Sequence, residues 1–127
     1  MILQPVRKEE ITHTQLVKYA GASGDFNPIH TVVPIAQKAG FKDVIAHGML
    51  IMGIAGEALG KWGLQKQLKQ FKVRFQAMTF PGEKLIVEGK LNDPLIENGE
   101  VFKTGEIIIK NEQDEVKLKG SFRLSHM

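Results

Sequence analysis

The residues best suited to acid–base chemistry are Asp25 and His30, which stand five positions apart in the segment 24–30, GDFNPIH. A histidine titrates near neutrality and can give or take a proton, and a carboxylate can accept one from water. Pro28 argues against a regular helix here, because the residue before a proline is pushed toward extended geometry. On a tight loop, the two side chains can converge.

The residues around this pair are suited to holding such a loop. Asn27 can hydrogen-bond nearby backbone, and Pro28 stiffens the turn. We expect Asp25 to follow the C-terminal end of a helix, where the helix dipole disfavours negative charge and makes the carboxylate a better base. Burial would act in the same direction. The alternative is that Asp25 and Asn27 only form a turn and His30 is an ordinary loop histidine.

A second motif, His47-Gly48-Met49, opens a strongly apolar segment. The first N–H groups of a helix have no partner inside it and carry the positive end of its dipole. Gly48 has no side chain to block approach, so its N–H could bind a thioester carbonyl as it becomes an enolate. The alternative is that Gly48 allows tight packing and His47 caps the helix.

The N-terminal half is predicted to form helices and loops. The long helix is apolar on nearly all sides, so we expect it to be buried on all sides. Gly53, Gly56 and Gly60 share one of its faces, where another element could approach closely. The predicted helices are residues 15–20, with Thr12 or Thr14 as N-cap and Gly21 and Gly24 at the end; residues 34–40, from Pro34 to Gly40; and residues 49–59.

The C-terminal half alternates between apolar and polar residues, which is typical of half-buried strands. Turn signals at Asn98-Gly99 and Asn111-Glu112 favour short connections and antiparallel pairing. The sequence therefore predicts an α+β fold with the sheet wrapped around the apolar helix, in a single domain over residues 1–127. The predicted strands are residues 71–77, 84–91, 101–109 and 116–124.

The composition narrows the chemistry further. The 127 residues contain no cysteine, which excludes disulfides, cysteine-ligated metals and thiol nucleophiles. The histidines show no metal-ligand spacing, so we expect no metal and no cofactor; they are His13, His30, His47 and His126. The net charge of +3 indicates a solvated surface or attraction to an anionic partner, such as the phosphates of coenzyme A or an acidic carrier protein. We expect no nucleic-acid binding, no signal peptide and no membrane span, and hence a cytoplasmic protein.

The two motifs together resemble those of the MaoC-like (R)-specific enoyl-thioester hydratases and dehydratases. The similarity lies in GDFNPIH at 24–30 and in HGML at 47–50, and it extends over nearly the whole chain. Within the family, the stretches 19–30 and 47–53 most resemble the catalytic subunits of mycobacterial (3R)-hydroxyacyl-carrier-protein dehydratase. One departure is Gly56, where some relatives carry a serine.

The resemblance implies a hot-dog fold, with an active site near the interface of a homodimer or a heterodimer of two hot-dog chains. It implies that Asp25 and His30 activate one water and that the Gly48 N–H binds the thioester oxygen. We expect Asn27, His47 and Met49 to contact a substrate carried by coenzyme A or acyl carrier protein. Two alternatives stay open: a thioester hydrolase, and a non-catalytic subunit of a hot-dog heterodimer.

Overall fold

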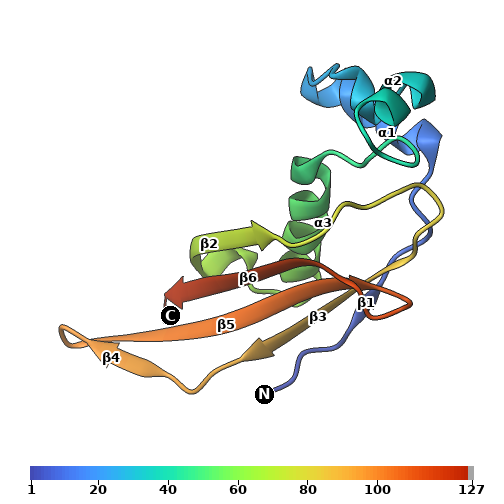
Figure 1. Cartoon of the computed structure of the whole chain (residues 1–127). Helices are drawn as coiled ribbons and strands as arrows, with labels where there is room; N and C mark the ends of the chain where they lie inside the picture. Colours follow the sequence, from blue (N-terminus) through green and yellow to red (C-terminus); the bar gives the residue numbers. More distant parts are fainter. Residues whose placement is uncertain (126–127) are drawn as a thin grey trace.

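The strands form one antiparallel sheet in the computed structural model, which describes residues 1–125 (Figure 1). The strand order is β1-β3-β5-β6-β2, and β4 pairs with β5 beyond this path. The edge strand β2 therefore leaves one side of its backbone unpaired within the described chain. The bounds are β1 Val6–Arg7, β2 Leu68–Phe75, β3 Leu85–Leu91, β4 Leu95–Glu97, β5 Glu100–Asn111 and β6 Val116–Ser125.

The long helix α3 (Gly48–Lys61) lies against one face of this sheet (Figure 1). Alternation along the strands places their apolar residues on that face. The α+β fold with a sheet around one long helix is thereby confirmed. The inner-face core residues of the sheet are Leu85, Val87, Ile107, Ile109, Leu118, Phe122 and Leu124.

The predicted turns lie between the strands. Asn98 and Gly99 have positive φ angles of 51° and 78° and connect β4 to β5. Two consecutive residues with positive φ form the kind of tight turn that matches the twist of an antiparallel hairpin. The sequence analysis missed β4 because it is only three residues long and all of them are exposed.

The helices before α3 form an overhang at its N-terminal end (Figure 1). Thr12 caps α1, since its Oγ1 accepts a hydrogen bond of 3.0 Å from the Gln15 N–H. The helix passes through Gly21 and ends at Gly24, whose φ of 78° is left-handed, so only the second of the two predicted stop signals acts. These elements are α1 His13–Ser23, the 3-10 turn η1 Pro28–His30 and α2 Val33–Lys38; a second turn, η2 Gln65–Gln67, precedes β2.

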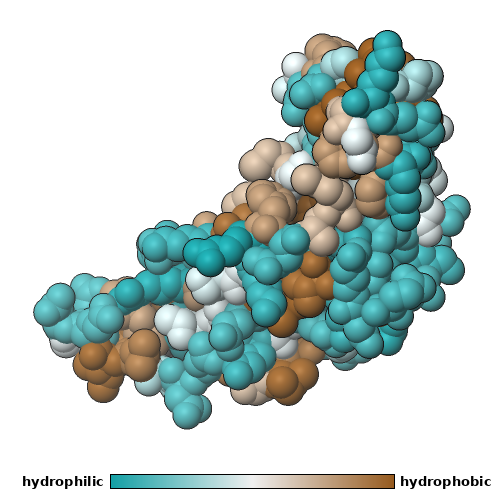
Figure 2. Space-filling model, viewed as in Figure 1, coloured by the Kyte–Doolittle hydropathy of each residue, from teal (hydrophilic) through white to brown (hydrophobic). Residues whose placement is uncertain are grey.

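The expectation that α3 is buried on every side is wrong for this chain. Met49 is 61% exposed. A Cβ built on Gly53 or Gly56 would meet no atom within 4 Å, so no other element approaches that face. Figure 2 shows apolar surface between the overhang and the sheet, where α3 lies in Figure 1. Among residues 1–125, no helix is both long enough and apolar enough to cross a membrane.

Candidate active site

Residues 24–30, which we call the catalytic loop after the role proposed for it below, are held by hydrogen bonds between near neighbours in the sequence. The Asp25 N–H donates to Ser23 Oγ at 3.1 Å. The Asn27 N–H donates to Asp25 Oδ1 at 3.2 Å, and the Ile29 N–H donates to Asn27 Oδ1 at 3.2 Å. The prediction that Asn27 hydrogen-bonds nearby backbone in this turn is confirmed. Each bond spans two residues, so the loop shapes itself largely from its own side chains.

The His30 ring is fixed by a backbone carbonyl outside the catalytic loop. Its Nδ1 lies 2.7 Å from the Ile45 carbonyl oxygen. A carbonyl can only accept, so Nδ1 carries the hydrogen, and in the neutral ring Nε2 carries the lone pair. Nε2 lies 3.8 Å from Asp25 Oδ2. That separation is too long for a direct hydrogen bond but lets one water bond to both atoms.

The two side chains differ in their exposure. The His30 side chain is 10% exposed and the Asp25 side chain 53%. In the isolated chain, about half of the Asp25 side chain is therefore open to solvent. The pair combines a fixed, buried imidazole with a carboxylate open to solvent.

His47 contacts both members of this pair. It is 1% exposed and occupies the N-cap position of α3, but its side chain makes no capping hydrogen bond. Its Nε2–H donates to the Asp25 carbonyl oxygen at 3.1 Å. Its ring stacks on that of His30, with centroids 3.8 Å apart, and contacts the edge of Tyr19. His47 thus connects the start of α3 to both members of the pair.

The structure also brings three residues of metal-binding types together: ligand atoms of Asp25, His30 and His47 lie within 4.8 Å of one another. The donor geometry does not suit one ion. The lone pair of an imidazole lies in the ring plane, and the two rings are stacked at an interplanar angle of 20°. Both cannot point at one metal at about 2.0–2.1 Å. The cluster fits proton transfer better than metal binding.

A pocket of about 490 Å³ opens beside His30 and the first turn of α3. Gly48 forms part of its wall, where a Cβ would lie 3.3 Å from the Phe75 ring. A side chain at residue 48 would therefore make the Phe75 ring or α3 shift by a few tenths of an ångström. The other lining residues are Ile45, Ala46, Ile51, Phe75, Gln76, Ala77, Met78, Thr79 and Lys117.

Lys117 is the lining residue that the sequence analysis placed wrongly. Strand alternation put it on the polar face, whereas its side chain is 1% exposed. Its Nζ donates to the Met78 carbonyl at 2.7 Å, lies 2.9 Å from Glu83 Oε1 and also contacts the Glu115 carboxylate. The register between β5 and β6 shifts after Ile109, which makes Lys117 the extra residue of a bulge. A bulge redirects a side chain that strict alternation would send outward.

The Lys117 contacts hold residues 76–83, which we call the pocket wall because residues 76–79 line the pocket. Burial raises the pKa of Glu83, but hydrogen bonds from the Phe80 N–H, Asn111 and Lys117 outweigh it and hold the pKa below its ordinary value. The wall in turn reaches the start of α3, because the Thr79 carbonyl accepts from the Ala46 N–H at 2.8 Å. No local pattern in the sequence signals this network.

The other predicted site residues take more varied positions. Asn27 and Met49 are exposed, Asn27 with its amide oxygen committed to the loop and Met49 on the first turn of α3. His13 lies apart, with Nε2 2.7 Å from the Thr31 carbonyl. His126 lies outside the described residues. The structure thus joins Asp25, His30, His47 and Gly48 in one place.

Residues 3–117 match the MaoC like domain family. The chain is 36% identical over 96 residues to the peroxisomal hydratase-dehydrogenase-epimerase of Neurospora crassa, covering 74% of this chain. It is 37% identical over 83 residues to the peroxisomal enoyl-CoA hydratase 2 of Arabidopsis thaliana, covering 63%. It spans only 10% of the first relative and 27% of the second.

Solved structures share the fold. The (R)-hydratase from A. caviae involved in PHA biosynthesis superimposes with a TM-score of 0.82 at 20% identity, covering 100% of this chain and 97% of that one. The HadBC (3R-hydroxyacyl-ACP dehydratase) complex from Mycobacterium tuberculosis gives 0.77 at 14% identity, covering 99% and 95%. The family match spans most of the sequence, and these neighbours share its architecture. The chain belongs to the MaoC-like hydratase and dehydratase family.

Proposed function

We propose that the chain catalyses reversible hydration of trans-2-enoyl thioesters to (3R)-3-hydroxyacyl thioesters, carried by coenzyme A or acyl carrier protein, in fatty acid metabolism. The observation that carries the proposal is the 3.8 Å separation of His30 Nε2 and Asp25 Oδ2 beside the pocket that Gly48 lines. A water held between these atoms would face a substrate whose carbonyl lies at the first turn of α3. The family membership supports the same chemistry.

The two side chains have different parts in the proposed step. His30, with Nδ1–H fixed on Ile45, offers Nε2 as an acceptor and orients the water. Asp25 takes a proton from that water as the oxygen bonds to C3. The double-bond electrons move onto the thioester oxygen as an enolate, and returning one proton to C2 completes the addition of one water. Such acid–base assistance contributes about 10²–10⁴-fold.

The Gly48 N–H stabilises the enolate in this proposal. It lies at the positive end of the α3 dipole, and the first N–H groups of a helix have no acceptor within it. A preorganised donor of this kind is typically worth about 10²–10³-fold in kcat. We propose that Met49 and Asn27 line the approach of the substrate. We assign buried His47 to holding the Asp25 backbone and the His30 ring.

We also propose that a second hot-dog chain pairs with the free edge of β2. An unpaired strand edge is a template for pairing with another chain. Large apolar side chains near that edge and the site are exposed: Phe26, Met49, Phe75 and Met78. Light scattering should give twice the 14.2 kDa of the chain for a homodimer. A monomer that becomes active on adding a partner chain would indicate a heterodimer instead.

The test of the activity is turnover of trans-2-butenoyl-CoA, followed as loss of the conjugated double bond, with free thiol assayed in parallel. Asp25→Asn and His30→Ala should each lower kcat/KM by at least about 10²-fold. Asp25→Asn removes the base that takes the proton of the water, and His30→Ala removes the Nε2 acceptor that orients it. Chiral analysis of the product should give the (3R) alcohol. Thiol release in place of hydration would instead identify a thioester hydrolase.

Asp93→Asn is the matched control for Asp25→Asn. Asp93 lies in the exposed loop between β3 and β4, away from the pocket. It should retain the parent rate, and circular dichroism should show that all variants are folded. A folded parent that binds thioesters but converts none, alone or with a carrier-protein substrate, would point to a non-catalytic subunit.

We place the reaction in the cytoplasm, which is compatible with a chain that contains no cysteine. The two relatives described above are peroxisomal enzymes. Microscopy of the fluorescently tagged protein in its own cells would distinguish the two compartments.

A further inference from the structure

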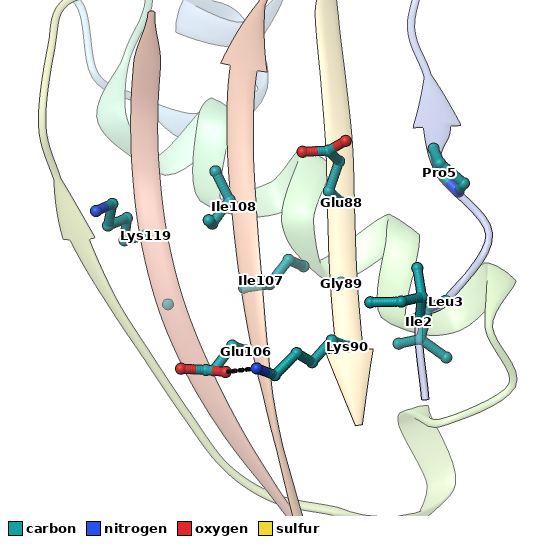
Figure 3. Close-up of a pocket in the computed structure, with 11 residues that line it drawn as sticks. Ile2, Leu3, Pro5, Glu88, Gly89, Lys90, Glu106, Ile107, Ile108 and Lys119 are labelled. Atoms are coloured by element: carbon teal, nitrogen blue, oxygen red, sulfur yellow. Dashed lines mark ion pairs between the residues drawn. The ribbon is translucent and has the colours of Figure 1, made fainter. Parts of the chain in front are cut away.

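The face of the sheet away from α3 is charged, and most of its charges are paired. Figure 3 shows this face, with Lys90 of β3 joined to Glu106 of β5. Pairing of this kind neutralises one basic residue each of β3, β5 and β6 on this face. The pairs are Lys90–Glu106, Lys110–Glu88 and Arg123–Glu97.

Where β6 lies beside the second half of the edge strand β2, the basic residues on this face are not paired within the described chain. Arg74 lies directly opposite Lys119 in the β2–β6 register. Lys72 is two residues from Arg74, so it points to the same face. All three side chains belong to exposed residues, and within residues 1–125 none has an acidic group within ion-pairing distance. We call Lys72, Arg74 and Lys119 the basic triad.

Such an arrangement is unfavourable for the isolated chain. Like charges directly opposite each other on neighbouring strands destabilise a sheet. The nearest acid in the register is Glu106, which lies opposite Ser121, and its carboxylate is paired with Lys90. The triad therefore gathers positive charge with no compensating group in the described chain, and a bound anion would supply it.

The triad lines a hollow of about 630 Å³, together with Gln76 and Ser121. Gln76 also lines the active-site pocket, so the two depressions share one lining residue, just after the end of β2. Arg74 and Gln76 flank Phe75, whose ring lies beside Gly48. Gln76 thus lies between an anion bound by the triad and the pocket beside His30.

We infer that the basic triad binds the phosphate groups at the far end of the phosphopantetheine arm that carries the acyl thioester. The inference rests on the proposed function for the identity of the arm. The arginine fork can bond two phosphate oxygens at once, and the lysines act as point charges. The Gln76 amide and the Ser121 hydroxyl can also donate. Coenzyme A and a carrier protein both present a phosphate there.

The binding test uses calorimetry with coenzyme A, 4′-phosphopantetheine and pantetheine, which differ in phosphate content. The parent should bind coenzyme A at least about 10-fold more tightly than pantetheine, and the difference should shrink with added salt, which screens exposed charges. The triple variant K72Q/R74Q/K119Q should lose most of that difference and bind pantetheine as the parent does. The control K18Q/K38Q/K103Q removes the same charge from exposed positions elsewhere.

The turnover test locates the effect in the reaction. For trans-2-butenoyl-CoA, the triple variant should raise KM about 10-fold with kcat within about 2-fold, because the triad contacts the arm and not the reacting atoms. For butenoyl-pantetheine it should change neither constant. Butenoyl carried on an acyl carrier protein forms the other arm: a larger KM effect there than with coenzyme A identifies the carrier protein as the physiological source.

The two proposals fail separately in this design. A triple variant that binds coenzyme A like the control variant overturns the triad site, even if the parent hydrates butenoyl-pantetheine through Asp25. Triad-dependent binding of coenzyme A by a parent that hydrates no enoyl thioester supports the triad site and rejects the proposed function.

Discussion

The catalytic loop and the pocket wall flank the same pocket but are built by opposite means. The loop, residues 24–30, is held by side-chain hydrogen bonds to backbone that each span two residues. The wall, residues 76–83, is held by Lys117 and Asn111, which are 39 residues from Met78 and 28 from Glu83. The loop is held by residues close to one another in the sequence, whereas the wall is held only once the sheet has formed.

The difference predicts how each part responds to damage. A bond between near neighbours costs little entropy to form, so its loss disturbs one turn. A buried charge that loses its partner is left in a poorly solvated site, and the cost falls on the whole fold. Variants of the wall should therefore change global stability, whereas variants of the loop should change activity first.

The largest effect is expected for Lys117→Met in the wall. It leaves Glu83 without its buried cation, which should lower the free energy of unfolding by about 3–5 kcal/mol. Urea unfolding at fixed protein concentration measures it. Lys119→Met, in the same strand but exposed, should stay within about 0.5 kcal/mol of the parent. Adding Glu83→Gln to Lys117→Met should restore part of the loss, and a single variant as stable as the parent would refute the role of the network.

Gly48→Ala should affect catalysis where wall and loop meet. The new Cβ would lie 3.3 Å from the Phe75 ring, so the ring or the helix must shift by a few tenths of an ångström. Small misplacements at a reacting centre are costly, and we expect kcat/KM to fall about 10-fold with little change in Tm. Gly53→Ala on the same helix meets no atom within 4 Å and should keep its rate. Equal rates for the two variants would contradict the tight approach at Gly48.

Asn27→Ala should weaken the loop while sparing the fold. It removes the acceptor for the Ile29 N–H, a cap typically worth about 0.5–2 kcal/mol. Faster hydrogen exchange at Ile29, with a lower kcat/KM, is the expected result. Asn27→Ser keeps a capping oxygen and should recover both. If Asn27→Ala unfolds the chain as readily as Lys117→Met does, the contrast between the two regions is wrong.

The smallest expected effect is on the way Tm depends on pH in acid. The pKa of Glu83 in the folded chain lies below its ordinary value of 4.5, because its hydrogen bonds outweigh its burial. The unfolded chain therefore binds a proton there first, and the stability that Glu83 contributes is lost as the pH falls from about 4.5 through the lower folded value. Glu83→Gln should make Tm less dependent on pH in that window. An unchanged pH profile would indicate that other carboxylates dominate acid unfolding.

The same contrast separates the features that the sequence predicted from those that it did not. The turn of the catalytic loop, the Thr12 cap and the Asn98-Gly99 turn depend on residues a few positions apart, and all three were predicted. The long strands followed from alternation. Lys117 was misplaced because one bulged residue reverses the direction of a side chain, and the bulge depends on pairing with β5.

The sequence by itself determined the turns, the apolar helix and the family, because each depends on residues close together along the chain. Only the tertiary structure decided how they meet: the Ile45 carbonyl that fixes His30, the stack of His47 on His30 and the buried Lys117 behind the pocket. These contacts join segments that come together only when the sheet and α3 have packed. Local preference can form a loop, but packing sets the distance between two loops.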